Sequence, residues 1–404
     1  MARPQRQPFR IYRVGGSVRD ELLGRTAGDR DWVVVGATPE MLVASGYRAV
    51  GSDFPVFLHP ETREEYALAR TERKHGRGYR GFEFFASPEV TLDEDLARRD
   101  LTINAMARDD DGRLIDPHGG EKDLIAGVLR HVSPAFVEDP LRVLRVARFA
   151  ARLGFAVAPE TRRLMRAVAR SGELATLTPE RVWQEVSRGL MEAQPSRMLA
   201  VLHDVGALAA VLPELAAVYS RRGPALARAL DRAAANVAGL PARYAVLARD
   251  LAVAVPESVR ARVRAAGALS ARLKVPTACR DAARLAARWT SELGRIGDLT
   301  PARVLDVLQA ADALRRPERL DALLEAHAAV APRHAPANAA WREALAAVRG
   351  VALRDVARAH QHADAIQKAV RAARLAALRA WRRERVRPGT PPRASRQRRR
   401  ASGA

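Results

Sequence analysis

The pair of carboxylates at Asp29 and Asp31 constrains this chain more than any other feature, because the two stand one residue apart at the start of an apolar, β-branched run. If residues 32–35 form a strand, side chains two positions apart share one face, so both carboxylates point the same way. Such a pair can bind a divalent metal ion. Hard oxygen ligands with few other protein groups suit Mg²⁺, which fills its remaining positions with water and substrate phosphates.

A glycine turn precedes the carboxylates. Residues 11–14 are expected to form a strand, Gly15 and Gly16 a turn, and residues 18–23 a short helix. A turn at a helix start offers backbone N–H groups to phosphate oxygens, and Arg19 adds a charged donor. Taken alone, Gly-Gly is usually a plain turn and Asp-x-Asp a solvated strand end. Their order along the chain favours a metal and phosphate site.

Length and composition bound the class of protein. A chain of 404 residues allows two to four domains with ample core. We expect a soluble, cytoplasmic protein, because no apolar run approaches the roughly 20 residues of a membrane helix and the N-terminus has no signal-peptide core. The single cysteine, Cys279, excludes an intramolecular disulfide and a multi-cysteine zinc site, which fits a reducing compartment.

The charge of the chain indicates a polyanionic partner. Lys and Arg number 68 against 46 Asp and Glu, which gives a net charge of +22. Nearly all of the basic residues are arginine, so codon bias in an arginine-rich proteome is the alternative explanation for part of this excess.

The sequence pattern changes along the chain, from alternating strands and short helices to helices alone. Strand-like segments at residues 48–59, 65–70 and 82–86 are separated by Gly, Pro and Asp turns, whereas the chain from about residue 134 is alanine-rich and helical. The sequence therefore predicts a small α/β head followed by an all-α neck, body and tail. The expected parts are a head at 1–133, a neck at 134–200, a body at 201–380 and a disordered basic tail at 381–404.

Two further segments of the head carry clustered polar residues. Residues 70–79 are dense in Arg and Gly and are expected to be mobile and functional. Residues 96–105 place Arg99, Asp100 and Asn104 on one short segment, where they could serve a triphosphate, a ribose and a base. A solvated helix start is the alternative interpretation of this second segment.

A helix is expected to open at Glu138, with Asp139 and Pro140 in its first turn. Four charged residues recur there at every third position, so each lies beside the next on a sloping row: Asp139, Arg142, Arg145 and Arg148. An exposed, salt-bridged helix face is the alternative. Further along, Thr178 is expected to cap a helix that has Arg181 where a capping box would have Glu or Gln.

Together these motifs resemble the bacterial class II tRNA nucleotidyltransferases, the CCA-adding enzymes, which share a polymerase-β-like nucleotidyltransferase superfamily with poly(A) polymerases. The resemblance covers about residues 10–200 and holds in the family's order. It rests on Gly15-Gly16-x-x-Arg19-Asp20, Asp29-x-Asp31, Arg98-Arg99-Asp100, Glu138-Asp139-x-x-Arg142 with Arg145 and Arg148, and Thr178-Pro179-Glu180-Arg181. The second half of the chain matches only loosely.

The resemblance implies template-independent addition and repair of the 3′-terminal CCA of tRNA from CTP and ATP, by a monomer or homodimer. It implies that Asp29 and Asp31 hold Mg²⁺ and that Gly16 and Arg19 contact the triphosphate. Arg99, Asp100 and Asn104 would complete the nucleotide site, with Arg145 and Arg148 facing the nucleotide or its phosphates.

The chemistry of Asp139 and Arg142 also indicates which bases they would bind. Cytosine and adenine both present an amino donor beside a ring-nitrogen acceptor, whereas uracil and guanine present a carbonyl acceptor beside a ring N–H donor. A carboxylate only accepts and a guanidinium only donates. Asp139 beside Arg142 therefore fits C and A and rejects U and G, and the resembled family implies the same side-chain template.

The sequence departs from many proteobacterial relatives of that family, which carry a C-terminal metal phosphohydrolase domain. Where those relatives read Cys-His-Asp, this chain reads Ala248-Arg249-Asp250, and it has no histidine between His203 and His327. We expect that this hydrolase activity has been lost. The remaining alternatives are a poly(A) polymerase, a partial enzyme that adds only CC or only A, and a non-catalytic RNA-binding protein.

Overall fold

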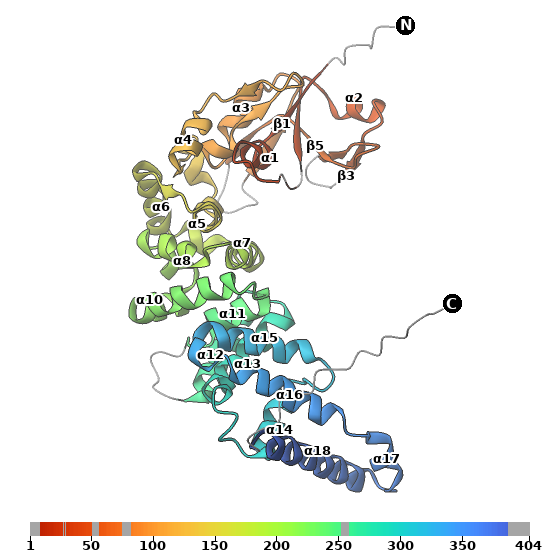
Figure 1. The fold of residues 1–404 in the computed structure, drawn as a ribbon. Helices are drawn as coiled ribbons and strands as arrows, with labels where there is room; N and C mark the ends of the chain where they lie inside the picture. Colours follow the sequence, from red (N-terminus) through yellow and green to blue (C-terminus); the bar gives the residue numbers. More distant parts are fainter. Residues whose placement is uncertain are drawn as a thin grey trace, which may run out of the picture. The chain divides into compact units, whose positions relative to one another are not determined.

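The computed structural model describes residues 9–386, apart from residues 27, 29, 51–55, 75–81 and 252–257. The chain divides into two compact units, residues 1–288 and residues 289–404 (Figure 1). The boundaries that we expect at residues 133, 200 and 380 are finer than this division and stay predictions.

A seven-stranded mixed sheet forms the centre of the head. Its strand order is β3-β4-β5-β2-β1-β8-β9, in which β2 pairs antiparallel with β1 and parallel with β5. The strands are β1 (Arg10–Val14), β2 (Asp31–Val35), β3 (Arg48–Val50), β4 (Val56–Leu58), β5 (Glu65–Leu68), β8 (Ala107–Arg108) and β9 (Leu114–Ile115). The segment expected as one strand at 48–59 is thus two antiparallel strands.

The central strand β2 is buried on both faces, which is why its sequence is a continuous apolar run. Val33 packs into one core cluster with Leu96, and Val34 packs into a second cluster with Phe57 and Tyr66. The helices of the head are α1 (Gly16–Leu22), α2 (Pro39–Ala44), α3 (Leu92–Ala97) and α4 (Gly120–Ala126), with the 3₁₀ turn η2 (Thr102–Asn104). The short helix expected after the glycine turn is confirmed as α1.

Two small sheets lie outside the main one. Strands β6 (Arg70–Lys74) and β7 (Phe82–Ala86) form an antiparallel hairpin. The expectation of a mobile segment over residues 70–79 is therefore wrong for its first five residues, and residues 75–79 lie outside the described part of the chain. Strands β10 (Val128–Leu129) and β11 (Ala156–Val157) pair in parallel, so one short strand does follow residue 134.

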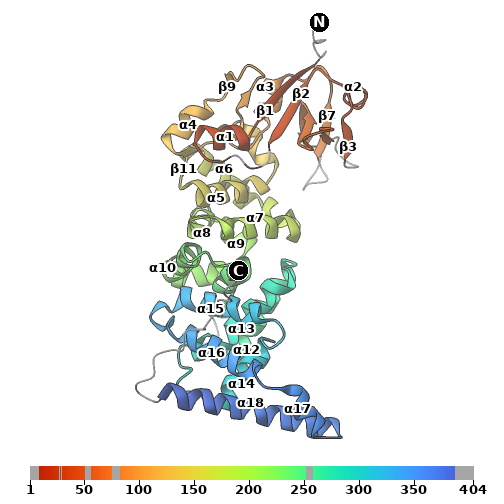
Figure 2. The same cartoon turned by 45° about the vertical axis from the view of Figure 1, so that its right-hand side comes forward.

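Helices build the rest of the first unit, and α5 packs against both α7 and α8 (Figures 1 and 2). The elements are η3 (Pro134–Glu138), α5 (Leu141–Leu153), α6 (Pro159–Ser171), η4 (Glu173–Thr176), α7 (Pro179–Met191), α8 (Pro195–Asp204), α9 (Ala207–Val211), α10 (Pro213–Ala235), α11 (Leu240–Ala248) and α12 (Val259–Arg272).

The helix expected to open at Glu138 begins at Leu141. Glu138 is the last residue of η3, and Asp139 is extended with φ −108° and ψ 104°. The physical reason is Pro140, whose ring disfavours the α conformation for the residue before it. The Asp139 carboxylate accepts the Leu141 N–H at 3.0 Å, so it satisfies one of the free amides at the helix start.

The second unit is helical throughout its described residues. Helix α13 (Thr277–Leu293) contains the boundary at residue 288, and α14 (Pro301–Ala310), α15 (Pro317–Val330), η5 (Pro332–His334), α16 (Ala337–Arg349), α17 (Leu353–Arg358) and α18 (Ala363–Val386) follow. The buried Trp341 donates to the Leu293 carbonyl at 2.8 Å. The disordered tail expected from residue 381 begins too early, since α18 continues to Val386; residues 387–404 lie outside the described part.

None of the described helices has the length and apolar character that would let it cross a membrane.

Candidate active site

A cavity of about 720 Å³ lies where the head meets α5 and α7. Of the eleven site residues predicted from the sequence, ten line it: Gly16, Arg19, Asp31, Arg99, Asp100, Asn104, Asp139, Arg142, Arg145 and Arg148. The eleventh, Asp29, lies outside the described residues. All the residues that line the cavity, predicted or not, come from six separate segments of the sequence.

The glycine turn is shaped by a close approach of Arg99. Gly15 has φ +70°, a conformation that glycine adopts without strain. A Cβ atom added at Gly15 would lie 2.8 Å from Nη1 of Arg99, which itself donates to the Asn104 carbonyl at 3.4 Å. A larger residue at position 15 would therefore displace the arginine.

Arg19 of α1 is buried and held on two sides. Its Nε and Nη2 donate to one carboxylate oxygen of Asp20 at 2.9 and 2.8 Å, and its Nη1 donates to Oδ1 of Asn104 at 2.5 Å. Burial lowers the pKa of Arg19, and the hydrogen bonds and charge of Asp20 offset part of this effect. Arg19 is therefore a fixed cation in the cavity wall.

The Arg98-Arg99 pair is oriented by Asp95, which is fully buried in α3. One carboxylate oxygen of Asp95 accepts from Arg98 at 2.8 Å and the other accepts from Arg99 at 3.0 Å. Burial alone would raise the pKa of Asp95, but the two arginines hold it below its usual range. Asp95 was missed by sequence reasoning, although a carboxylate three and four residues before two arginines on a helix is a recognisable signal.

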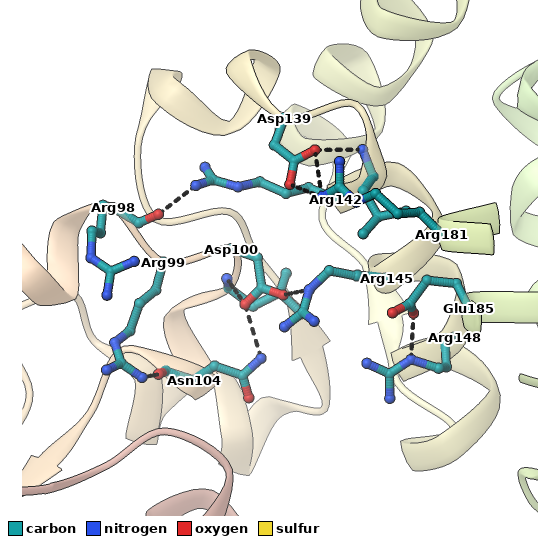
Figure 3. A network of polar contacts seen from close by, with 12 residues as sticks. Arg98, Arg99, Asp100, Asn104, Asp139, Arg142, Arg145, Arg148, Arg181 and Glu185 are labelled. Atoms are coloured by element: carbon teal, nitrogen blue, oxygen red, sulfur yellow. Dashed lines mark hydrogen bonds and ion pairs between the residues drawn. The ribbon is translucent and has the colours of Figure 1, made fainter. Parts of the chain in front are cut away.

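Asp100 joins the head to α5. Its Oδ1 accepts from the Leu101 N–H at 2.9 Å and the Asn104 amide at 3.0 Å, and its Oδ2 accepts from Nε of Arg145 at 2.7 Å (Figure 3). Burial would raise the pKa of this carboxyl, but Arg145 and Asn104 outweigh burial and lower the pKa to about 2. Asp100 is thus ionised, and both of its carboxylate oxygens accept hydrogen bonds from the protein.

Asp139 and Arg142 do not pair with each other among the described residues. The Asp139 carboxylate lies 3.2 Å from Nη2 of Arg181 on α7. Arg142 donates from Nη1 to the Ala135 carbonyl at 3.1 Å and from Nη2 to the Arg98 carbonyl at 2.5 Å (Figure 3). Asp139 and Arg142, the two residues expected to read the base, are therefore each held by other groups of the protein.

Arg148 is buried between α5 and α7, where its Nε donates to Glu185 at 2.6 Å. Its guanidinium also stacks 4.6 Å from the centre of the Phe149 ring, and those of Arg19 and Arg145 lie 5.1 and 5.9 Å from that ring. Phe149 thus packs against three arginines that line one cavity, with favourable cation–π geometry.

The cavity is strongly basic. Ten arginines and four aspartates line it, which suits a polyanionic ligand such as a nucleoside triphosphate. The sequence did not predict a site role for Phe149, Arg152 or Arg188, and it placed Asp20 and Arg181 in the motifs without a role in the site. The signal for Arg152 was present, because it lies seven residues after Arg145 and so on the same face of α5.

Asp31 is the described carboxylate that fits a hard divalent cation. It is exposed at the start of β2, lines the cavity, and pairs in register with Val14 of β1 and Glu65 of β5. No group of three or more His, Cys, Asp and Glu side chains that could hold a metal occurs within the described residues. The donor chemistry of Asp31, an exposed oxygen beside a phosphate-sized basic cavity, fits Mg²⁺ that shares its coordination with a substrate.

The dipeptide His203-Asp204 is used in packing and ion pairing. The Asp204 carboxylate contacts Arg162 at 3.4 Å and Arg166 at 3.2 Å, and the His203 ring lies 5.0 Å from that of Tyr219.

Two family models match segments of the first unit. Residues 11–130 match the model described as the poly A polymerase head domain, and residues 154–219 match the probable RNA- and SrmB-binding site of polymerase A. The multifunctional CCA protein of Azoarcus sp. (strain BH72) is 51% identical over 402 residues, which cover 93% of this chain and 98% of that protein. This chain belongs to the multifunctional CCA protein family. A second multifunctional CCA protein, from Laribacter hongkongensis, is 50% identical over 93% of this chain and 100% of its own length.

Solved structures agree with this membership of the multifunctional CCA protein family. The Bacillus stearothermophilus CCA-adding enzyme in complex with CTP has a TM-score of 0.66 and 27% identity over 93% of both chains. A CCA-adding enzyme in complex with ATP, at 20% identity, shares the fold with a TM-score of 0.65 over 89% of this chain and 85% of its own. The family and the α/β head with helical neck that the motifs predicted are confirmed.

Proposed function

We propose that this protein adds and repairs the 3′-terminal CCA of tRNA, using CTP and ATP and releasing pyrophosphate. The observation that carries the proposal is the basic cavity between the head and α5, in which carboxylates and arginines of six segments meet. Membership of a family whose proteins are named for CCA, and likeness to a CCA-adding enzyme that binds CTP, support the same reaction.

Asp31 would hold Mg²⁺ together with Asp29. The bound ions would activate the 3′ hydroxyl of the tRNA and neutralise charge on the α-phosphate and the departing pyrophosphate. The protein needs no covalent nucleophile for such a transfer. Its own groups bind the triphosphate and keep the hydroxyl and the α-phosphate in line.

The turn at Gly15 and Gly16 and the guanidinium of Arg19 would bind the triphosphate. Arg19 already lies in place through Asp20 and Asn104, so little side-chain freedom is lost when phosphate binds. Arg99, fixed by Asp95, would contact a second phosphate oxygen.

Asp100, Asn104, Arg145 and Arg148 would form the floor under the ribose and the phosphates. The base would be read by Asp139 as acceptor and Arg142 as donor, which suits the pairing edges of cytosine and adenine. A site built from such hydrogen bonds can reject the wrong base by roughly 10⁴-fold, because a mismatched edge leaves buried groups unpaired.

The deciding experiment is incubation with a tRNA that ends at the discriminator base, followed by sequencing of its 3′ end. With CTP and ATP we expect the ending CCA. A long adenosine tail would indicate a poly(A) polymerase, and an ending of CC alone, or A added only to a tRNA that already carries CC, would indicate a partial enzyme. No extension at all would favour a non-catalytic RNA-binding protein.

We further infer that the enzyme works in the cytoplasm as a monomer or homodimer. We also infer that it has no metal-dependent phosphohydrolase activity, because Ala248 and Arg249 stand where relatives carry the hydrolase motif. Metal-dependent turnover of a phosphatase or cyclic phosphodiester substrate would contradict this second inference.

A further inference from the structure

The two residues of the base-reading pair would neutralise each other if nothing else held them. Asp139 and Arg142 are three residues apart and carry opposite charges. An acceptor and a donor that bind each other turn toward one another and away from a base, so a working template holds them apart. Each has another partner here: Arg142 lies on two backbone carbonyls, and Asp139 lies against Arg181.

The two carbonyl contacts fix Arg142 firmly. The side chain is 8% exposed, and the acceptors come from two different elements, Arg98 after α3 and Ala135 in η3. Each terminal nitrogen of a guanidinium has two hydrogens, so two carbonyls leave other N–H groups available to a ligand.

Asp139 depends on Arg181 in the same way. Its Oδ1 accepts the Leu141 N–H at 3.0 Å, and its Oδ2 lies 3.2 Å from Nη2 of Arg181. A carboxylate offers about four acceptor positions, so these contacts orient it without using all of them. Of the two partners of Asp139, Leu141 and Arg181, only Arg181 is charged. Arg181 is the third residue of α7, and its backbone N–H donates to the Thr178 side chain that caps this helix.

We propose that Arg181 is a positioning residue for base selection: it holds the Asp139 carboxylate away from Arg142 and presents its remaining lone pairs to the amino group of C or A. This inference rests on the proposed function. Without Arg181, the Asp139 carboxylate is no longer held by a cation outside the pair, so it turns toward Arg142 three residues away and the pair closes on itself. The advantage of CTP and ATP over UTP and GTP then falls, while binding of the triphosphate is unchanged.

The test measures kcat/KM for all four nucleotides on a tRNA primer, in the wild type and in Arg181→Gln. We expect kcat/KM for CTP and ATP to fall by about tenfold and that for UTP and GTP to stay constant, so that discrimination narrows. Arg181→Lys keeps a positive charge near Asp139 and should retain most of the discrimination. A control is Arg295→Gln, which removes a 3.0 Å ion pair to Asp298 outside the cavity and outside both segments that match family models, and should change nothing.

A double-mutant cycle separates positioning from a general structural role. If Arg181 acts through Asp139, then adding Arg181→Gln to Asp139→Ala does not lower the preference for CTP and ATP over UTP and GTP any further. The inference would be overturned if the two substitutions lowered this preference by independent factors that multiply. It would also be overturned if Arg181→Gln alone kept the wild-type preference. The proposed function fails in a different way, because the wild type itself would then not add CCA.

Discussion

Two carboxylates, one in the cavity wall and one behind it, hold arginines of the cavity in place. Asp20 fixes Arg19, and Asp95 fixes both Arg98 and Arg99. A long flexible cation loses rotamer freedom when it binds phosphate, and an ion pair that has already removed that freedom lowers the cost of binding. The site is therefore organised before a nucleotide enters.

Asp100 gives a prediction about stability and pH. Its pKa is lowered to about 2, so its ion pair with Arg145 contributes stability above the ordinary carboxyl pKa of about 4 and loses it as the pH falls through 2. We expect Asp100→Asn to be less stable than the wild type by on the order of 2 kcal/mol at pH 7. Urea unfolding at a series of pH values measures this.

The difference in the free energy of unfolding between the two proteins should narrow as the pH falls from 4 to 2, because Asp100 is then protonated in the unfolded chain before it is protonated in the native protein. A gap that stays constant between pH 5 and pH 2.5 would contradict the assignment of that stability to the ionised Asp100.

At the scale of elements, α5 is the part that combines the two halves of the site. Arg145 and Arg152 on one face bind Asp100 and Asp20 of the head, while Arg148 binds Glu185 of α7. Residues seven apart on a helix share a face, which is why both head contacts come from the same side. The helix therefore links Arg19, which we propose binds phosphate, to Asp139 and Arg142, which we propose read the base.

The contact between Arg152 and Asp20 can be tested by itself. Arg152 lies 2.8 Å from the Asp20 oxygen that does not bind Arg19. We expect Arg152→Gln to loosen Asp20 and hence Arg19, and to raise KM for CTP and ATP equally, by about tenfold. Discrimination against UTP should stay at the wild-type level, which a four-nucleotide extension assay shows. A change in base preference with constant KM would contradict this role.

The order of motifs along the chain was enough to predict which residues meet, because each type of chemistry needs its own type of side chain. It could not predict the partners of those residues. Arg181 lies 42 residues from Asp139 and Glu185 lies 37 residues from Arg148, and such pairings depend on how α7 packs on α5. The sequence predicts the start of α5 too early because Asp139 and Pro140 are both good first-turn residues, whereas Pro140 disfavours the α conformation at Asp139.

On the scale of the whole molecule, the excess of basic residues is expected to serve RNA binding. Residues 387–404 alone contain six arginines and no acidic residue. If they contact phosphates, a chain that ends at Val386 should bind tRNA with a flatter dependence of log affinity on log salt than the full chain. An unchanged slope in a salt series would show that these residues do not contribute, and CCA addition at low salt serves as the control for folding.

We propose that the site divides into a metal-and-phosphate half at Asp31 and a base-reading half at Asp139. The most direct test extends a tRNA that ends at the discriminator base with each of the four nucleotides, using the wild type, Asp31→Ala and Asp139→Ala. We expect that Asp31→Ala adds no nucleotide to the tRNA, whereas Asp139→Ala still adds nucleotides but no longer prefers C and A. Wild-type preference in Asp139→Ala, or normal transfer by Asp31→Ala, would contradict it.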